Sequence, residues 1–448
     1  MNTPVERPAA SANAQPQHWA KLDEADRDAL LMRPALRDDD AVRADVEGIV
    51  TRVRSAGDRA LAELTRELDR ADVADCRVGH DEFIAAEAAL DASAVAAIER
   101  AIANVRRFHE AQMPRAVVVD TAPGVRCERI TQPLDAVGLY VPAGSAPLPS
   151  TAIMLCVPAT IAGCPERVLC TPPRADGSAD PAVLVAARRA GVDRVFKVGG
   201  AQAIAAMAYG TESIPRVARI FGPGNAWVTA AKRYVATDPA GASIDMPAGP
   251  SEVLVIADAA ADPRWVAADL LSQAEHGTDS QAVLISTCEE VADAVLREAW
   301  AQVESLPRRD IASVALDNSR YIVATDLGEA VAISNRYAPE HLILHVEAPR
   351  ALLPSIRNAG SVFVGPWSPE SVGDYCSGTN HVLPTYGAAR SYSSLGLDQF
   401  MRHMTVQELT REGLAHIGPT VIELAQLEGL EGHARAVRLR LESAGSRS

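Results

Sequence analysis

The sequence predicts an α/β protein built on two parallel sheets, and three observations carry that prediction. Short apolar strands alternate with helical segments from about residue 136 onward. Glycine loops join several strands to the following helices, as at Gly199-Gly200 and Gly222-Pro-Gly-Asn225. The alternation pauses near Gly249-Pro250 and then resumes. Since strand–helix repeats of this kind form parallel sheets with right-handed crossovers, we expect two α/β domains in tandem.

The residues before this alternation indicate an extension followed by helices. Residues 1 to about 17 are rich in Pro, Ala and Asn, which is typical of a disordered extension, and Trp19 is the first aromatic anchor. From about residue 38 to 113 the chain is rich in Ala, Arg and Glu, with an apolar stripe at helical spacing. The stripe comprises Val42, Val46, Ile49, Val50 and Val53.

The two alternating units each contain several strands. The strands expected in the first unit are residues 136–141, 167–171, 194–198 and 218–221, and the helices are 150–162, 181–190, 201–209 and 225 to about 235. The strands expected in the second unit are residues 252–257, 282–286, 321–324, 342–346 and 361–364. After about residue 391 the pattern predicts helices and a polar tail.

Composition narrows the class of function. With 43 basic and 58 acidic residues the net charge is −15, so nothing favours binding to nucleic acid or to an anionic membrane. The seven cysteines are odd in number and form no Cys-x-x-Cys pair, which favours reduced thiols in a cytoplasm. The most apolar stretch, residues 151–162, is too short to span a bilayer, and no signal peptide is visible at the amino terminus.

A metal-binding pattern lies in Asp269-Leu-Leu-Ser-Gln-Ala-Glu-His-Gly277. Gln273 and His276 are three residues apart, so they share one face of a helix. An amide oxygen and an imidazole nitrogen provide half of a ligand set for a borderline cation such as zinc. The alternative is a polar helix end capped by Gly277, and this segment alone does not decide between the two.

Three further segments contain candidate partners. Glu340-His341 follows a proline, and a histidine near its ordinary pKa suits proton transfer at neutral pH. The loop from Gly373 to His381 follows a strand and carries Asp374, a possible oxygen ligand. Glu428 and His433 lie near the start of a carboxyl-terminal helix, where His433 could supply the missing nitrogen. Taken singly, a turn is the favoured explanation of Glu340-His341, and helix capping is that of Glu428 and His433. A plain turn explains the run from Gly373 to His381 less well, because the run is long and chemically varied.

The glycine loops are informative because of what they lack. Gly199-Gly200-Ala-Gln202 and Gly222-Pro-Gly-Asn225 each join a strand to a helix, where backbone amides can approach a phosphate. The sequence contains no Gly-x-Gly-x-x-Gly after a strand and no Walker loop. Residue patterns alone therefore support nucleotide binding only weakly.

Taken together, these segments resemble the histidinol dehydrogenase family over nearly the whole chain, from about residue 38 to about residue 440. The motifs that carry the resemblance are Val137-Gly-Leu-Tyr-Val-Pro142, Gly199–Ile204, Gly222–Val228, Asp245–Glu252, Asp269–Gly277, Ala338–Leu342 and Gly373–Tyr386. The resemblance implies zinc-dependent oxidation of L-histidinol to L-histidine through L-histidinal, with two NAD reduced in succession. It also implies incomplete Rossmann-like domains, which would explain the absent fingerprint.

The resemblance assigns roles residue by residue. The zinc ligands would be Gln273, His276, Asp374 and His433, with one zinc per subunit. His341 would be the base and Glu340 would activate the water that hydrates histidinal. Further substrate contacts would be Ser251, His381 and Glu428, and NAD contacts would be Tyr140, Gln202 and Asn225.

The resemblance also implies a homodimer with exchanged carboxyl-terminal segments, so that Glu428 and His433 would reach the active site of the other subunit. The expected domains are an extension at 1–36, a discontinuous α/β domain at 37–138 and 250–390, an NAD-binding α/β domain at 139–249, and an exchanged helical tail at 391–448. One departure concerns Ala143-Gly144, where the family has two glycines. An alanine that needed a positive φ there would cost roughly 1 kcal/mol and loosen NAD binding.

Three rival interpretations stay open at the level of sequence. A related dehydrogenase could act on another polyol, such as a sulfonated propanediol, without an imidazole pocket. A zinc hydrolase could use Glu340 as a base on metal-bound water. A catalytically silent zinc-binding protein would keep the ligands without turnover.

Overall fold

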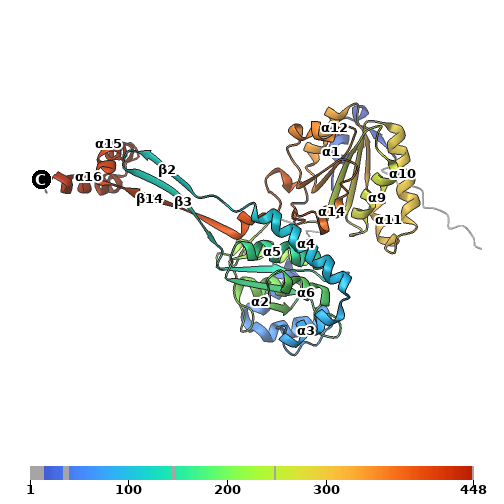
Figure 1. Ribbon diagram of the computed structural model, residues 1–448, viewed down its shortest axis with the longest axis horizontal. Helices are drawn as coiled ribbons and strands as arrows, with labels where there is room; N and C mark the ends of the chain where they lie inside the picture. Colours follow the sequence, from blue (N-terminus) through green and yellow to red (C-terminus); the bar gives the residue numbers. More distant parts are fainter. Residues whose placement is uncertain (1–14, 34–39, 144–146, 247–248, 446–448) are drawn as a thin grey trace, which may run out of the picture.

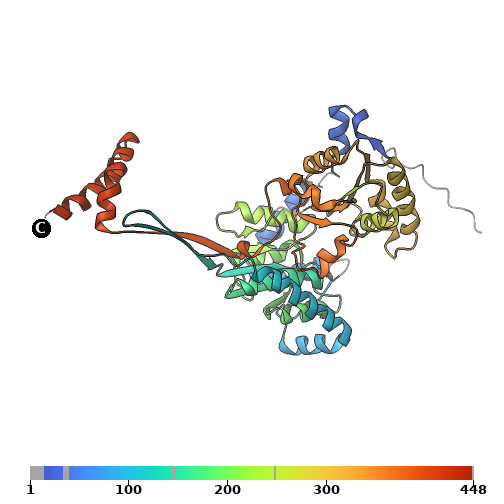
Figure 2. The same cartoon turned by 45° about the horizontal axis from the view of Figure 1, so that its top comes forward.

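The computed structural model describes residues 15–33, 40–143, 147–246 and 249–445, and these form two α/β lobes and a long arm (Figure 1). We call the lobe around residues 136–246 lobe 1 and the lobe around residues 252–375 lobe 2. The arm extends away from both lobes, and the second view agrees (Figure 2). Residues 1–14, where disorder was predicted, lie outside the described residues.

Lobe 1 is built on a five-stranded parallel sheet in the order β6-β5-β4-β7-β8. Its strands are β4 (Ala136–Tyr140), β5 (Glu166–Thr171), β6 (Val195–Lys197), β7 (Arg219–Phe221) and β8 (Ser243–Ile244). Its crossover helices are α5 (Pro149–Ile161), α6 (Pro181–Arg189), α7 (Gly200–Tyr209) and α8 (Ala226–Thr237). The strands and helices predicted for the first unit are thus present.

The amino-terminal helices also pack on lobe 1. They are α2 (Asp40–Leu64), the π-helical turn Thr65–Asp69, α3 (His80–Ala89) and α4 (Ala92–Glu110). Val46 and Val50 share a buried cluster with Ile204 of α7, and Ile102 shares another with Leu155 of α5. The predicted grouping of residues 37–138 with residues 250–390 is therefore wrong, because the apolar stripe identifies a helix but not the sheet that it covers.

Lobe 2 is built on a six-stranded parallel sheet in the order β1-β11-β10-β9-β12-β13. Its strands are β1 (Gln17–His18), β9 (Glu252–Ala257), β10 (Gln281–Ser286), β11 (Arg320–Val323), β12 (His341–His345) and β13 (Ser361–Val364). Its helices are α1 (Glu24–Leu30), α9 (Pro263–Ala274), α10 (Glu289–Val303), α11 (Arg309–Asp317), α12 (Leu327–Tyr337), α13 (Pro349–Leu352) and α14 (Glu370–Tyr375). Gln17 pairs with Ile322, so the ordered chain begins before the predicted end of the extension.

The two sheets share one strand order. In each, the first strand of the unit is central, the next two extend to one side and the last two to the other, which is a doubly wound order of five strands. Lobe 2 adds the amino-terminal strand β1 beside β11. The prediction of two incomplete Rossmann-like domains is confirmed. Reversal of direction creates a switch point between β4 and β7 in lobe 1 and between β9 and β12 in lobe 2.

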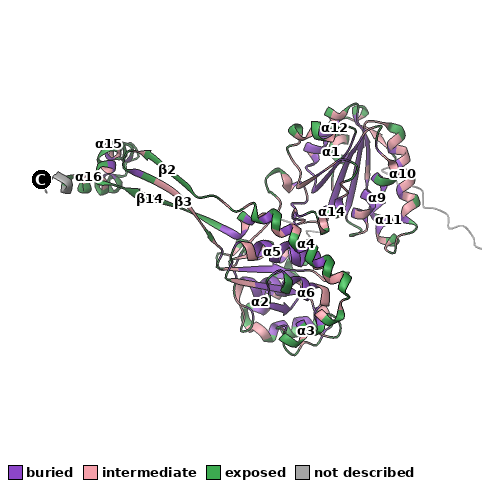
Figure 3. Cartoon of the chain, viewed as in Figure 1, coloured by how far each residue is buried: buried purple, intermediate pink, exposed green. Residues whose placement is uncertain are grey.

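The arm combines an antiparallel sheet with a helix pair. Its elements are β2 (Val117–Ala122), β3 (Val125–Pro133), β14 (Met401–Leu409), α15 (Arg411–Leu427) and α16 (Glu431–Gly445). The tail from 391 was predicted to be helical throughout, but β14 precedes the helices because it pairs with β3 along its whole length. Most of the arm is exposed (Figure 3). Among the described residues, no helix is long and apolar enough to cross a membrane.

Candidate active site

The residues predicted to be catalytic lie at the amino ends of β9 and β12, the two central strands of lobe 2. Glu252 is the first residue of β9, His341 is the first residue of β12, and Glu340 directly precedes it. The pairing of His341 with Val253 brings the two strand ends side by side. All three side chains are buried, with 1%, 4% and 6% exposure for Glu252, His341 and Glu340. Such burial is rare for titratable groups and marks a functional site.

The imidazole of His341 has a fixed orientation. Its Nδ1 lies 3.0 Å from the carbonyl oxygen of Glu252. Because a carbonyl only accepts, the proton of the neutral ring lies on Nδ1, and Nε2 carries the free lone pair. Nε2 has no hydrogen-bond partner and lies 3.6 Å from an Oδ1 of Asp374, beyond hydrogen-bond distance. Nε2 is therefore the unpaired ring nitrogen, and it lies on the side of Asp374.

Glu340 is held by the same backbone. Its Oε2 accepts a 2.8 Å hydrogen bond from the amide of Glu252, and it lies 3.7 Å from Nδ1 of His341. Burial raises the pKa of Glu340 to about 8, although the nearby imidazole and the amide oppose that rise. A carboxyl group with such a pKa exchanges protons near neutral pH.

Helix α14 contributes two carboxylates, one of which the sequence prediction missed. Asp374 was predicted, but Glu370, one helical turn earlier, was not. Glu370 is 1% exposed, and its Oε1 lies 3.8 Å from Nδ1 of His341. The i, i+4 spacing of the two carboxylates was the available signal, since it places both on one helix face.

The centre has an excess of negative charge. Burial lowers the pKa of His341, but Glu370, Glu340 and Asp374 outweigh it and raise that pKa well above the ordinary value. For the carboxyl group of Glu370 burial has the opposite effect and raises the pKa. Several buried carboxylates around one imidazole are a site that a bound cation would stabilise.

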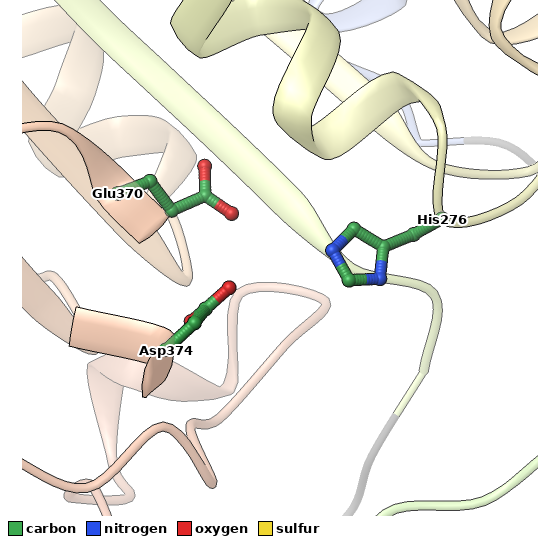
Figure 4. Close-up of side chains that lie close together, drawn as sticks. All are labelled: His276, Glu370 and Asp374. Atoms are coloured by element: carbon green, nitrogen blue, oxygen red, sulfur yellow. The ribbon is translucent and has the colours of Figure 1, made fainter. Parts of the chain in front are cut away.

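A candidate metal site adjoins this centre. Ligand atoms of His276, Glu370 and Asp374 lie within 4.8 Å of one another, and their side chains converge in Figure 4. Gln273 is fully buried, yet neither its Oε1 nor its Nε2 has a hydrogen-bond partner. Gln273 precedes His276 by three residues, and its unpartnered amide oxygen, an imidazole and carboxylates are all donors that zinc accepts.

The segment around Gln273 and His276 is folded as a helix end. Helix α9 ends at Ala274, so Gln273 lies in its last turn and His276 follows it. The amide of His276 still donates to the carbonyl of Gln273 at 3.2 Å, which keeps the two residues close together. Gly277, considered as a left-handed cap, is not among the described glycines with positive φ.

The other predicted substrate residues divide into two groups. Ser251 precedes Glu252, and its carbonyl accepts from Gln281. His381 lies at the boundary of the lobes, where its Nε2 is 3.4 Å from Oγ1 of Thr151 on α5. Glu428 and His433, by contrast, are exposed on the arm, which extends far from α9 and α14 (Figure 1). Within one chain these two residues do not join the site.

The predicted NAD residues lie at the carboxyl ends of strands in lobe 1. The hydroxyl of Tyr140, the last residue of β4, accepts from the amide of Gly200 at 3.0 Å. Gln202 donates to Asp69 at 3.1 Å, and its buried Oε1 has no partner. Asn225 caps α8 by accepting from the amide of Val228 at 3.1 Å. These contacts provide structural roles for all three residues, so they do not by themselves require a nucleotide.

The backbone at Gly222 and at Ala143 bears on the proposed glycine loops of lobe 1. Gly222 has a φ of +117°, and a Cβ there would lie 2.1 Å from the carbonyl oxygen of Tyr140, so only glycine fits at this switch point. Ala143 is not among the described non-glycine residues with positive φ, so the predicted strain at that position does not arise. Gly144 lies outside the described residues.

Comparisons with known proteins agree with the resemblance. The family model described as histidinol dehydrogenase matches residues 32–441. The histidinol dehydrogenase of Vibrio parahaemolyticus is 54% identical over 424 residues, which cover 95% of this chain and 97% of that protein. The one from Xanthomonas euvesicatoria is 55% identical over 94% of this chain and 98% of its own length. A solved histidinol dehydrogenase from Elizabethkingia anophelis matches with a TM-score of 0.92 at 45% identity, covering 95% of this chain and 98% of that one.

Proposed function

The chain belongs to the histidinol dehydrogenase family, NAD-dependent oxidoreductases of histidine biosynthesis, and we propose that its catalytic centre is the cluster at the amino ends of β9 and β12. The reaction is the oxidation of L-histidinol to L-histidine through L-histidinal, with two NAD reduced. The observation that carries the proposal is the buried Glu340-His341 pair, with Asp374 of the His276, Glu370 and Asp374 cluster 3.6 Å from Nε2 of His341.

His341 is the proposed base in both oxidation steps. Its Nδ1 is engaged by the carbonyl of Glu252, so Nε2 is the atom that takes the alcohol proton as hydride leaves the carbon for NAD. In the second step the same nitrogen takes a proton from the hydrated aldehyde. The burial of His341 keeps water from competing for this proton.

Glu340 is the proposed base for hydration of histidinal. Its raised pKa suits a group that accepts a proton from water and returns it. Its Oε2 is fixed by the amide of Glu252, which leaves Oε1 to face the reacting water. The two bases thus serve different steps from neighbouring positions.

Zinc is the proposed metal, held by Gln273, His276, Asp374 and by His433 of the partner subunit. The orphaned oxygen of Gln273 and the surplus of carboxylates support this assignment. When bound, zinc would supply a fixed positive charge that orients the imidazole and amine of histidinol. Glu370 adds a further carboxylate to the same group and is a candidate for a supporting role.

A homodimer with exchanged arms is the proposed assembly. The arm exposes apolar side chains on both its strands and its helices, more than an isolated hairpin and helix pair can stabilise in water. The exposed large apolar residues are Val117, Val118, Val119, Met404, Val406, Leu409, Val421, Leu424, Leu427, Leu430 and Leu439. An exchanged arm would bury them and bring Glu428 and His433 to the other lobe 2.

NAD is proposed to bind at the switch point of lobe 1, near Tyr140, Gln202 and Asn225. The close approach of Gly222 to Tyr140 and the helix start at α8 are features of a phosphate-binding crevice. A cytoplasmic location stays a prediction from the sequence.

The direct test is the yield of NADH from purified protein given histidinol and NAD. We expect two equivalents of NADH per histidinol, with histidine as product, and loss of turnover without NAD. NADH from a sulfonated propanediol but not from histidinol would instead support the polyol rival. Turnover that needs no NAD would support the hydrolase rival.

A further inference from the structure

The backbone of Glu252 holds both proposed catalytic side chains. Its amide donates to Oε2 of Glu340 at 2.8 Å, and its carbonyl oxygen lies 3.0 Å from Nδ1 of His341. A shift of this peptide would move both groups at once. The position of Glu252 therefore sets the geometry of the site.

The side chain of Glu252 is a buried carboxylate that pairs with the guanidinium of Arg33. Nε of Arg33 lies 2.5 Å from Oε1 of Glu252, and Nη2 lies 2.9 Å from Oε2, which is the bidentate arrangement of the strongest ion pairs. The amide of Tyr386 also donates to Oε1 at 2.9 Å. Glu252 is 1% exposed, so loss of the guanidinium would leave a buried charge uncompensated.

Arg33 also donates hydrogen bonds to the turn that precedes Glu340 and His341. Its Nη2 donates to the carbonyls of Tyr337 at 2.8 Å and of Ala338 at 3.3 Å. The guanidinium lies 3.9 Å from the ring centre of Tyr337. Ala338 has a φ of +56°, a conformation that an alanine adopts only when its surroundings enforce it. One guanidinium thus fixes the start of β9 and the turn before β12.

We propose that Arg33 is a positioning residue of the active site, which acts through Glu252 to align Glu340 and His341. The inference rests on the proposed catalytic roles of those two residues. It also assigns a role in positioning the active site to the amino-terminal segment, residues 15–33, which no motif in that segment predicts. Lysine cannot replace the planar fork, because it offers one ammonium where two parallel hydrogen bonds are made.

The test compares Arg33→Met and Arg33→Lys with the control Arg27→Met. Arg27 lies in the same segment and contacts the carbonyl and ring of Trp19, but not Glu252. In the zinc-loaded enzyme we expect kcat to fall by about 100-fold in Arg33→Met, since misplacement of catalytic groups by about 1 Å has an effect of this size. Arg33→Lys should show a smaller loss. KM for NAD and zinc content should stay at the wild-type values in both.

The outcomes separate the inference from the proposed function. A folded Arg33→Met with kcat near the wild-type value would overturn the inference, and so would an equal loss of kcat in Arg27→Met. If Arg33→Met does not fold, Arg33→Lys decides by the same criterion. If the wild type forms no NADH from histidinol, or if His341→Asn stays fully active, the proposed function itself fails.

Discussion

The two lobes share the order of five strands, but their candidate functional residues lie at opposite ends of the strands. In lobe 1 the glycine loops follow the carboxyl ends of β6 and β7, and a Cβ at Gly222 would collide with the carbonyl of Tyr140. In lobe 2 the buried Glu340 and His341 lie at the amino ends of β9 and β12. Both places adjoin the switch point of their sheet.

The difference shows what a general rule for α/β sheets does and does not predict. The rule places ligands outside the carboxyl ends of strands at the switch point, which suits the glycine loops of lobe 1. In lobe 2 the strand ends supply free backbone groups instead, and Glu252 uses its amide and carbonyl to hold two side chains. Fold alone therefore does not indicate where the proposed catalytic centre lies, whereas the position of buried titratable groups does.

The largest expected effect is that of His341→Asn in lobe 2. Loss of the base should lower kcat by about 10²–10⁴-fold, the usual range for general base catalysis. Bound zinc should stay at the wild-type amount, because His341 is not a proposed ligand. Steady-state kinetics with metal analysis of the same sample checks both. Full activity in this variant would remove His341 from the mechanism.

The second effect concerns the proposed metal ligands of lobe 2. His276→Asn should lose bound zinc and activity together, with metal affinity lowered by more than about 100-fold, since even supporting residues of metal sites have effects near that size. Metal content by elemental analysis after dialysis is the measurement. An unchanged metal content would refute the ligand assignment for His276.

The third effect probes lobe 1 through Gly222→Ala. A Cβ at this position would collide with the carbonyl of Tyr140, so KM for NAD should rise by roughly tenfold, equivalent to about 1.4 kcal/mol of binding. Histidinol oxidation at saturating NAD should change little. The matched control is Gly163→Ala, since Gly163 also has a positive φ but no atom within 4 Å of a Cβ. Equal effects of the two variants on KM would show strain rather than a cofactor site.

The smallest effect is a pH dependence of stability in lobe 1. Burial raises the pKa of Asp69 to about 6, against the opposing hydrogen bond from Gln202. The folded state therefore keeps a proton that the unfolded state has lost, and stability should fall as pH rises from about 4 to about 6. Allowing for partial exposure, we expect about 1 kcal/mol. Asp69→Asn should flatten this fall in urea denaturation, and a curve parallel to the wild type would contradict the expectation.

Much of the fold was predictable because its signals are local. Strands such as β9 and β12 are short apolar runs next to glycine or proline, and their neighbours in sequence complete the pattern. The arm strands were missed because β3 pairs with β14, some 270 residues away, and their faces are exposed. The local pattern of apolar residues therefore does not predict that these strands pair.

The site was predictable only in part for a similar reason. Gln273, His276, Glu340 and His341 lie in dense polar motifs, which a sequence displays directly. Glu370 and Arg33 look like surface residues, and only tertiary packing buries Glu370 beside His341 and joins Arg33 to Glu252. Burial of a charge is a property of the fold, so local sequence does not reveal it.

The most direct test of a shared active site is complementation between two inactive variants, His341→Asn and His433→Asn. If the partner's arm completes each lobe 2, a mixed dimer contains one doubly altered site and one intact site. Random mixing should then restore about a quarter of the wild-type activity, because half of the dimers are mixed and half of their sites are intact. No recovery in a mixture that demonstrably exchanges subunits would contradict the shared active site.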